Sequence, residues 1–222
     1  MRVGLRRSGG GGKRGLQQVL SSHLLGRAAR AAGLALSAGL LSACAILSGP
    51  SASTTFDLTR PPAADRSTSA SGTIMVIPEP TALAVLNTDR IVIKPVPVLI
   101  NYYEGSRWSD RLPPLVQARL LQAFENRQRG IAVGRPSDGL DGDYALVVDI
   151  RAFEVVVQPG PSALVELSVK IVGAQTGRIA AARVFSANVP LATDEVASGI
   201  AGLDAALQQI MAELVTWASG RI

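Results

Sequence analysis

The chain has 222 residues, with 22 basic residues, 17 acidic residues, one histidine and one cysteine, and a formal net charge of +5. Seven of the basic residues and none of the acidic ones precede Cys44, so 15 basic and 17 acidic residues follow it and that part carries −2. The basic character therefore belongs to the N-terminal segment, and we expect no nucleic-acid-binding patch. The part after Cys44 also lacks histidine and cysteine. This excludes Ser-His-Asp and Cys-His catalysis, and zinc sites built on those residues. We expect no enzyme activity, no metal and no cofactor.

The N-terminal segment has the three parts of a secretory signal. Basic residues come first, an apolar run follows at 31–41, and small residues lead to Cys44. Leu41-Ser42-Ala43-Cys44 resembles a bacterial lipobox, in which the cysteine sulfur receives a diacylglyceryl group and the cysteine becomes the new N-terminus. The reaction needs a nucleophilic sulfur at this position. The sequence predicts lipidation at Cys44; a buried cysteine ending an N-terminal helix is the alternative. The long basic region leaves the true start codon open.

Composition divides the chain into three parts. Residues 1–43 are the predicted lipoprotein signal peptide, residues 44–72 the lipidated cysteine with a Ser- and Pro-rich tether, and residues 73–222 a folded domain. Residues 56–58 interrupt the tether and fit either a tether or a short edge strand. No apolar run after residue 44 approaches the ~20 residues of a membrane helix. Membrane attachment is therefore expected through acyl chains such as palmitate, of which more than one is needed for stable anchoring.

The first half of the domain combines short strands with one helix. Apolar runs predict strands at 73–78, 90–94, 96–103 and 130–134, with a turn of helix or a loop at 83–86. The second and third runs fit either a hairpin or one kinked strand. A helix is expected over 112–127, because Leu112, Val116, Leu120 and Phe124 recur every four residues. Arg119 and Arg127 lie off that stripe and are expected to be solvated.

The second half predicts an antiparallel meander over 143–188. Apolar residues alternate from Tyr144 to Ile150, and their parity then shifts, which indicates a bulge near Ala152. A further alternating strand covers 165–171, between turns at 158–162 and 175–177. The carboxylates of Asp149 and Glu154 are expected to face outward and need no catalytic role.

The last predicted element is a long amphipathic helix from Asp194 to Ser219. Thr193 or Asp194 can cap it, and Gly220 ends it. Its apolar seam fits packing on a sheet or a coiled coil, and we expect the sheet because tertiary burial supplies most helical stability. The fold class is α/β: a mixed, largely antiparallel sheet with packed helices, including this C-terminal helix. The seam consists of Val196, Ile200, Leu203, Leu207, Ile210, Leu214 and Trp217.

Three aromatic residues are candidate partner-binding residues. Trp108 fits an exposed anchor for a protein partner or a lid over the core, and the core is favoured because large aromatic residues are mostly buried. Tyr102 and Tyr103 point to opposite faces if extended, so at most one is expected in the core. The acidic loop with Asp138, Asp141 and Asp143 lacks the glutamate that ends a calcium loop, so turn chemistry explains it better than a metal.

The order of these elements resembles the ABC-type transport auxiliary lipoprotein family, the PqiC-like small lipoproteins associated with MCE-type lipid-transport systems. The resemblance rests on the lipobox, on Phe56-Asp57-Leu58, on Tyr102 to Pro113, on Tyr144 to Ile150 and on the closing helix with Trp217. It implies an α/β domain on a lipoprotein at the periplasmic face of the outer membrane of a Gram-negative bacterium. Its implied partners are an MCE-type protein with its permease and ATPase. A homo-oligomer is left open, and Ala45 agrees with outer-membrane sorting.

The sequence leaves three functions open. The first is a non-enzymatic auxiliary component of an ABC/MCE-type intermembrane lipid-transport system. The second is a periplasmic carrier that itself binds lipid, which the high Val, Leu, Ile and Ala content permits. The third is an outer-membrane lipoprotein that activates a cell-wall enzyme. The transported lipid and its direction of movement are not encoded in any motif of the sequence.

Overall fold

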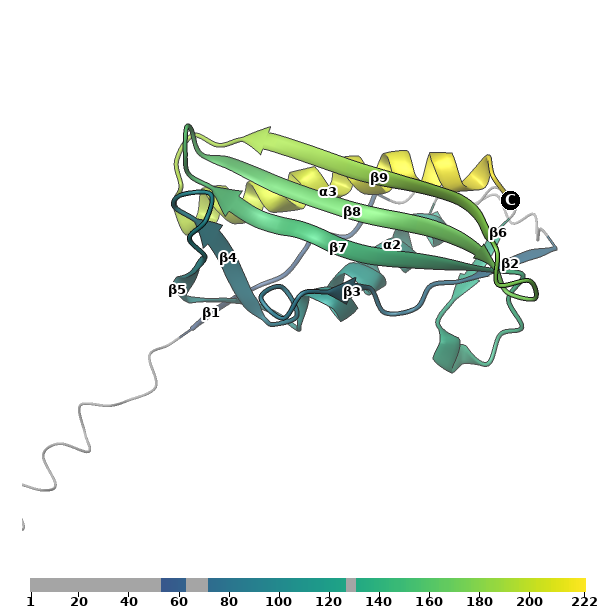
Figure 1. Cartoon of the computed structure of the whole chain (residues 1–222). Helices are drawn as coiled ribbons and strands as arrows, with labels where there is room; N and C mark the ends of the chain where they lie inside the picture. The colour runs from purple at the N-terminus through teal and green to yellow at the C-terminus, as the bar shows by residue number, and fades with distance from the viewer. Residues whose placement is uncertain (1–52, 63–71, 127–130) are drawn as a thin grey trace, which may run out of the picture. The chain divides into compact units, whose positions relative to one another are not determined.

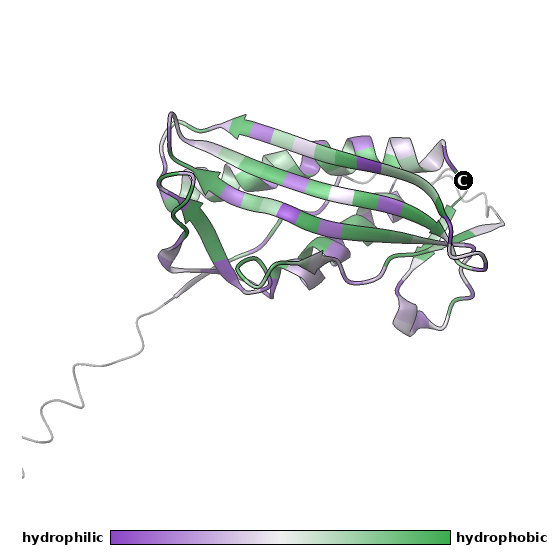
Figure 2. Ribbon diagram, viewed as in Figure 1, coloured by the Kyte–Doolittle hydropathy of each residue, from purple (hydrophilic) through white to green (hydrophobic). Residues whose placement is uncertain are grey.

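The frame of the molecule is a meander of three long antiparallel strands. In this computed structural model, which describes residues 53–62, 72–126 and 131–222, they are β7 (Tyr144–Val156), β8 (Ser162–Gly173) and β9 (Ile179–Pro190) (Figure 1). Hydrophobic and hydrophilic residues alternate along β7 and β8 (Figure 2). The burial of their side chains alternates over much of both strands, as the sequence predicts. The pairing register shifts between Ile150 and Ala152, which confirms the predicted bulge.

The other edge of β7 pairs with three short strands in succession. β2 (Thr73–Val76), β3 (Thr81–Ala82) and β4 (Arg90–Lys94) run parallel to it, from its first residues to its last. β6 (Ile131–Gly134) extends this edge by pairing with β2. A single long strand thus acts as the spine of a mixed, nine-stranded sheet.

The remaining strands form a smaller wing at one end of this sheet. β5 (Asn101–Trp108) pairs antiparallel with β4, which confirms the hairpin alternative, and β1 (Thr54–Phe56) pairs parallel with β5. β5 begins at Asn101 rather than at residue 96. The prolines at 95 and 97 have no backbone N–H to donate to a neighbouring strand. Residues 96–99 form a turn instead, in which Leu99 N donates to the Val96 carbonyl.

Two long helices lie against the same face of the sheet, α2 (Leu112–Asn126) and α3 (Val196–Ser219) (Figure 1). α2 follows the predicted stripe, and a 3₁₀ turn at Pro136–Asp138 leads into β7. The core lies between the helices and the sheet, where large side chains such as Phe153 and Leu167 are fully buried. None of the helices in the described part of the chain is both long and apolar enough to cross a bilayer. The predicted fold class is confirmed.

The apolar seam of α3 packs on β8 and β9, so the expected sheet packing is confirmed. Two glycines allow this close approach. A Cβ atom on Gly202 would lie 2.9 Å from the Ala163 Cβ, and one on Gly199 would lie 2.9 Å from the Val155 Cγ2. The predicted cap is wrong: the N-cap is Glu195, without a side-chain cap bond, whereas Gly220 caps the C-terminus as expected.

Candidate functional site: an N-terminal clamp and an apolar end

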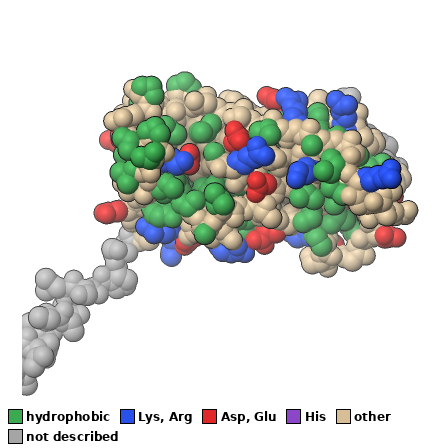
Figure 3. Space-filling model, in the orientation of Figure 1, with side chains coloured by type: hydrophobic (Ala, Val, Ile, Leu, Met, Phe, Trp, Pro, Cys, Tyr) green, Lys and Arg blue, Asp and Glu red, His purple; other side chains and the backbone are tan. Residues whose placement is uncertain are grey.

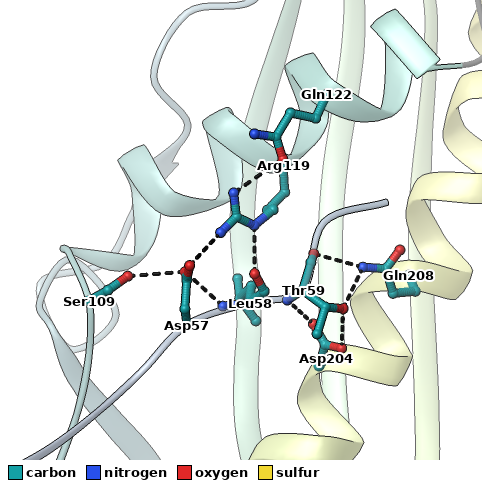
Figure 4. A network of polar contacts seen from close by, with 8 residues as sticks. All are labelled: Asp57, Leu58, Thr59, Ser109, Arg119, Gln122, Asp204 and Gln208. Atoms are coloured by element: carbon teal, nitrogen blue, oxygen red, sulfur yellow. Dashed lines mark hydrogen bonds and ion pairs between the residues drawn. The ribbon is translucent and has the colours of Figure 1, made fainter. Parts of the chain in front are cut away.

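The residues that follow β1 are held between the two helices by a network of polar contacts, which we call the N-terminal clamp (Figure 4). Its centre is Leu58, whose side chain is 1% exposed and belongs to the core. Both neighbours of Leu58 are polar and are bound by side chains of α2 and α3. The clamp consists of Asp57, Leu58, Thr59, Ser109, Arg119, Gln122, Asp204 and Gln208.

Arg119 forms the α2 side of the clamp. Its Nε donates to the Leu58 carbonyl at 2.8 Å, its Nη2 pairs with Asp57 Oδ2 at 2.8 Å, and its Nη1 donates to Gln122 at 3.2 Å. The side chain is 8% exposed. The expectation that Arg119 is solvated is therefore wrong. The guanidinium can be buried because its donors find partners on the segment that crosses α2.

Two residues of α3 form the other side. Asp204 accepts bonds from the Thr59 backbone N at 2.8 Å and from its Oγ1 at 2.6 Å (Figure 4). Gln208 Nε2 donates to the Thr59 carbonyl at 2.9 Å. A little further along, Asn126 Nδ2 donates to the Pro61 carbonyl at 2.8 Å. The polar face of α3, opposite its apolar seam, therefore binds this segment.

Because of the clamp, the folded domain begins earlier in the sequence than composition predicts. Composition predicts a tether up to residue 72, but residues 54–56 pair with β5, and residues 57–61 bind both helices. A Ser- and Pro-rich segment lacks a continuous apolar face, yet one buried Leu58 and a set of hydrogen bonds hold it in place. Of the two alternatives for residues 56–58, the strand fits Phe56, while Asp57 and Leu58 belong to the clamp.

The second feature is the loop between β4 and β5, residues 95–100, whose sequence is Pro-Val-Pro-Val-Leu-Ile. Val98 is 93% exposed, Leu99 46% and Ile100 42%. Figure 3 shows hydrophobic side chains gathered at the end of the molecule that carries this loop. We call this loop, with the two connections beside it, the apolar end.

The neighbouring connections are fixed by backbone hydrogen bonds. Val157 N, at the start of the β7–β8 turn, donates to the Lys94 carbonyl at 3.0 Å. Leu191 N, in the β9–α3 connection, donates to the Pro161 carbonyl at 2.9 Å. Three connections that are far apart in the sequence therefore meet at one end, and residues 95–100 and 157–161 contain no charged side chain.

One carboxylate close to this end is buried. Glu154 is 7% exposed and pairs with Lys94 Nζ at 2.8 Å. The expectation of two outward-facing carboxylates therefore holds for Asp149, which is exposed and accepts a bond from Thr81, but not for Glu154. The cause is β4, which pairs with β7 at Glu154 and brings a lysine beside it.

Trp108 lies in the core rather than on the surface. Its side chain is 2% exposed, and its ring meets Phe153 edge to face with the centroids 5.8 Å apart. This burial corrects the hypothesis of an exposed anchor at this position and matches the lid that the sequence favoured.

The two tyrosines at the start of β5 are both half-buried. The Arg90 guanidinium lies 3.6 Å from the ring centroid of Tyr102, a cation–π contact. The Tyr103 hydroxyl donates to the Asp194 carbonyl at 2.7 Å. Burial, together with the charge of Asp194, raises the pKa of Tyr103 to about 12. Both rings make contacts inside the domain, and contact with a partner through their exposed parts stays a prediction.

Two aspartates of the acidic loop accept hydrogen bonds from backbone N–H groups and so stabilise the loop. Asp138 accepts from Arg135 N at 2.7 Å, and Asp143 accepts from Ile74 N at 2.8 Å, while Asp141 is exposed. Within residues 53–62, 72–126 and 131–222 no three metal-binding side chains come together. Cys44 and the rest of the predicted lipobox lie outside the described residues, as does His23.

The comparison with family models decides the family. The model described as ABC-type transport auxiliary lipoprotein component matches residues 56–215. The match begins in β1 and ends in α3, so it includes both the clamp and the apolar end. The chain belongs to this family. The members are auxiliary lipoproteins of ABC-type transport, which is a non-enzymatic and envelope-associated role, and the suspected resemblance is confirmed.

Similar proteins agree with this assignment. The chain is 34% identical over 171 residues to the uncharacterized protein bll6063 of Bradyrhizobium diazoefficiens; the match covers 76% of this chain and 45% of that relative, so it spans about half of the relative's length. The crystal structure of protein XCC0632 from Xanthomonas campestris is 26% identical with a TM-score of 0.65, over 74% of this chain and 94% of the other. A second crystal structure, of an uncharacterized protein, has a TM-score of 0.61 at 13% identity, over 75% of this chain and 98% of the other, and shows the same fold.

Proposed function

We propose that this protein is lipidated at Cys44 and acts at the periplasmic face of the outer membrane as a non-enzymatic component of an MCE-type lipid-transport system. The observation that carries the proposal is the family match over residues 56–215, which covers almost the whole folded domain. The family name supplies the ABC-type transporter and the lipoprotein. The lipobox at Cys44 supplies the site of attachment, and the small residue Ala45 supports outer-membrane sorting.

The clamp gives this anchored protein a defined attachment point. Ten peptide links separate Cys44 from Thr54, so the chain between them spans at most about 36 Å. From Asp57 onward the segment is bound to both helices. An acyl group at Cys44 would therefore hold the whole domain close to one membrane surface, because only a short segment separates it from the clamp.

The packing of the interior favours an adapter over a lipid carrier. Leu203, Leu207 and Leu214 of α3 and Leu167 of β8 are each fully buried. The apolar layer between the helices and the sheet is filled by such side chains, so apolar content is used for the core. Partner contact therefore falls to the outer surfaces, and the exposed parts of Tyr102 and Tyr103 remain candidates there.

Affinity capture from the native host tests the proposal. The acylated protein, tagged after Ile222, is crosslinked in intact cells and purified from the membrane fraction, and the captured proteins are identified by mass spectrometry. We expect an ATPase, a permease and an MCE-type protein, and we expect a deletion strain to become more sensitive to bile salts. A Cys44→Ala strain controls for anchoring, since its protein should leave the membrane fraction. Capture of a cell-wall synthase without transporter subunits would refute the proposal.

A further inference from the structure

We propose that the β4–β5 loop, residues 95–100, inserts its exposed apolar side chains into the lipid bilayer that holds the acyl chains. This inference rests on the proposed lipidation of Cys44. It assigns a membrane-binding surface to the folded domain itself, in addition to the covalent anchor.

The first argument is the exposure of the loop. Val98 is 93% exposed and its two successors are between 42% and 46% exposed. Single exposed apolar residues are ordinary, but consecutive ones on a loop tip form a contiguous patch, which marks an interaction surface. The domain does not use this patch for its core: Ile91 and Val92 of β4 are core residues at 0% and 2% exposure, whereas Val98, Leu99 and Ile100 neither belong to the core nor pack against it.

The second argument is the direction of the chain. β1 is parallel to β5, and Thr54 lies opposite Ser106. Followed backwards, β1 therefore heads toward the end at which β5 begins, which is Asn101, directly after the loop. Five residues of strand separate Asn101 from Ser106, or about 17 Å at the usual rise of 3.3 Å per residue. The first described strand of the chain thus points, at its N-terminal end, toward the apolar end.

The third argument is charge. The loop and the adjoining β7–β8 turn contain no charged residue, and Lys94 beside them is neutralised by Glu154 at 2.8 Å. In the β9–α3 connection that meets this end, the exposed charges of Asp194 and Glu195 are acidic. Insertion would therefore be driven by apolar burial, and it would not depend on anionic lipid as a basic patch does. A bilayer rich in neutral headgroups matches this surface.

The experiment uses the acylated full-length mature protein. Because Cys44 is the only cysteine, and a thioether sulfur is unreactive toward maleimides, Val98→Cys provides a single thiol for the fluorophore NBD. The matched control is Ile179→Cys, a site that is 57% exposed at the opposite end of β8 and β9. Both proteins are reconstituted in vesicles of phosphatidylethanolamine and phosphatidylglycerol, with and without brominated acyl chains. Circular dichroism checks that both variants are folded.

We expect the probe at position 98 to shift to shorter emission wavelengths and to be quenched several-fold more than the probe at 179. Equal quenching, or two probes that stay in water, would overturn the inference. So would shielding of position 98 that depends on protein concentration and not on brominated lipid, which would assign the loop to a second copy, or shielding only when transporter subunits are added. The intact mass of each sample distinguishes a failure of the proposed lipidation from a failure of the proposed loop insertion. A protein without acyl mass refutes the proposed function, whereas an acylated protein with an unquenched probe at 98 refutes the loop alone.

Discussion

Charged side chains usually lie at the surface of a domain and aliphatic ones in its core. The clamp and the apolar end are opposite exceptions to this distribution. The clamp buries a guanidinium, that of Arg119, and the apolar end exposes an aliphatic side chain, that of Val98, to 93%. Within the domain, the cost of burying the guanidinium is offset by hydrogen bonds, because its donors reach Asp57, Leu58 and Gln122. The apolar end has no such compensation within the described residues. The first feature therefore belongs to folding and the second to contact with something outside the domain.

Among the substitutions that probe the clamp and the apolar end themselves, Arg119→Met is expected to have the largest effect on stability. The substitution leaves the buried Leu58 carbonyl without its donor, while Asp57, which is 57% exposed, can be solvated by water, so the free energy of unfolding should fall by about 1–3 kcal/mol. Urea denaturation followed by circular dichroism measures it. Arg111→Met is the matched control: its pair with Glu79 is about half exposed on both sides, so a change below about 1 kcal/mol is expected. Equal losses in the two variants would mean that the clamp is not a special contact.

Thr59→Val tests the α3 side of the clamp. The variant keeps the side-chain volume but loses the hydroxyl that bonds Asp204 at 2.6 Å and accepts from Gln208 at 3.1 Å. We expect a loss of about 1–2 kcal/mol in the same unfolding experiment. Thr81→Val removes one exposed bond, to Asp149, and should cost less. A Thr59 variant as stable as the parent would show that the hydroxyl contacts with α3 do not stabilise the domain.

Tyr103 lies near the start of β5, beside the apolar end, and adds a dependence on pH. Its pKa is raised to about 12 in the folded protein from 10.0, so the folded state favours the protonated phenol. The resulting stability is fully present below pH 10 and is lost as the pH rises toward 12. Tyr103→Phe should cost about 1 kcal/mol at pH 7 through the lost bond to Asp194.

The alkaline arm is measured by thermal unfolding between pH 9 and 12. The melting temperature of the parent protein should fall over that range as Tyr103 ionises, and Tyr103→Phe should lack this part of the fall. Tyr102→Phe is the control and should retain the decline, because Tyr103 is still present. If Tyr103→Phe unfolds with the same alkaline profile as the parent, the pKa assignment is wrong.

The smallest effect on stability is expected from Val98→Asp. A substitution on an exposed loop tip usually changes the free energy of unfolding by no more than about 0.5 kcal/mol. The same change at Val148, which is 2% exposed in β7, would bury an unpaired carboxylate and should prevent folding or cost more than about 4 kcal/mol. A large loss at position 98 would contradict the interpretation of the loop as a surface that the domain does not need.

Most of the fold could be predicted from periodicity. The meander, its bulge at Ala152 and the burial of the α3 seam all follow from regular alternation over long elements. The short strands are harder to predict, because β1 has three residues and β3 two, which is too short for a pattern. The start of β5 was misplaced because an apolar run of 96–100 has the composition of a strand, although its prolines and its exposure make it a loop.

The clamp could not be predicted from local sequence, since its partners are 61 and 145 residues apart. A polar residue off the apolar stripe of a helix is usually solvated, and nothing near Arg119 in the sequence marks its distant acceptors. One signal was available. Asp57 and Leu58, an acidic and an apolar residue inside a Ser- and Pro-rich segment, depart from tether composition and are the residues that Arg119 binds.

The central claim is that an acylated Cys44 holds this domain at a membrane, and the intact mass of the protein from its native host tests it most directly. The protein is extracted from the membrane fraction and its N-terminal peptide is sequenced by mass spectrometry. We predict a chain that begins at Cys44 and carries the added mass of diacylglycerol and a further acyl chain. A chain that begins elsewhere, or a Cys44 without acyl mass, would contradict the account.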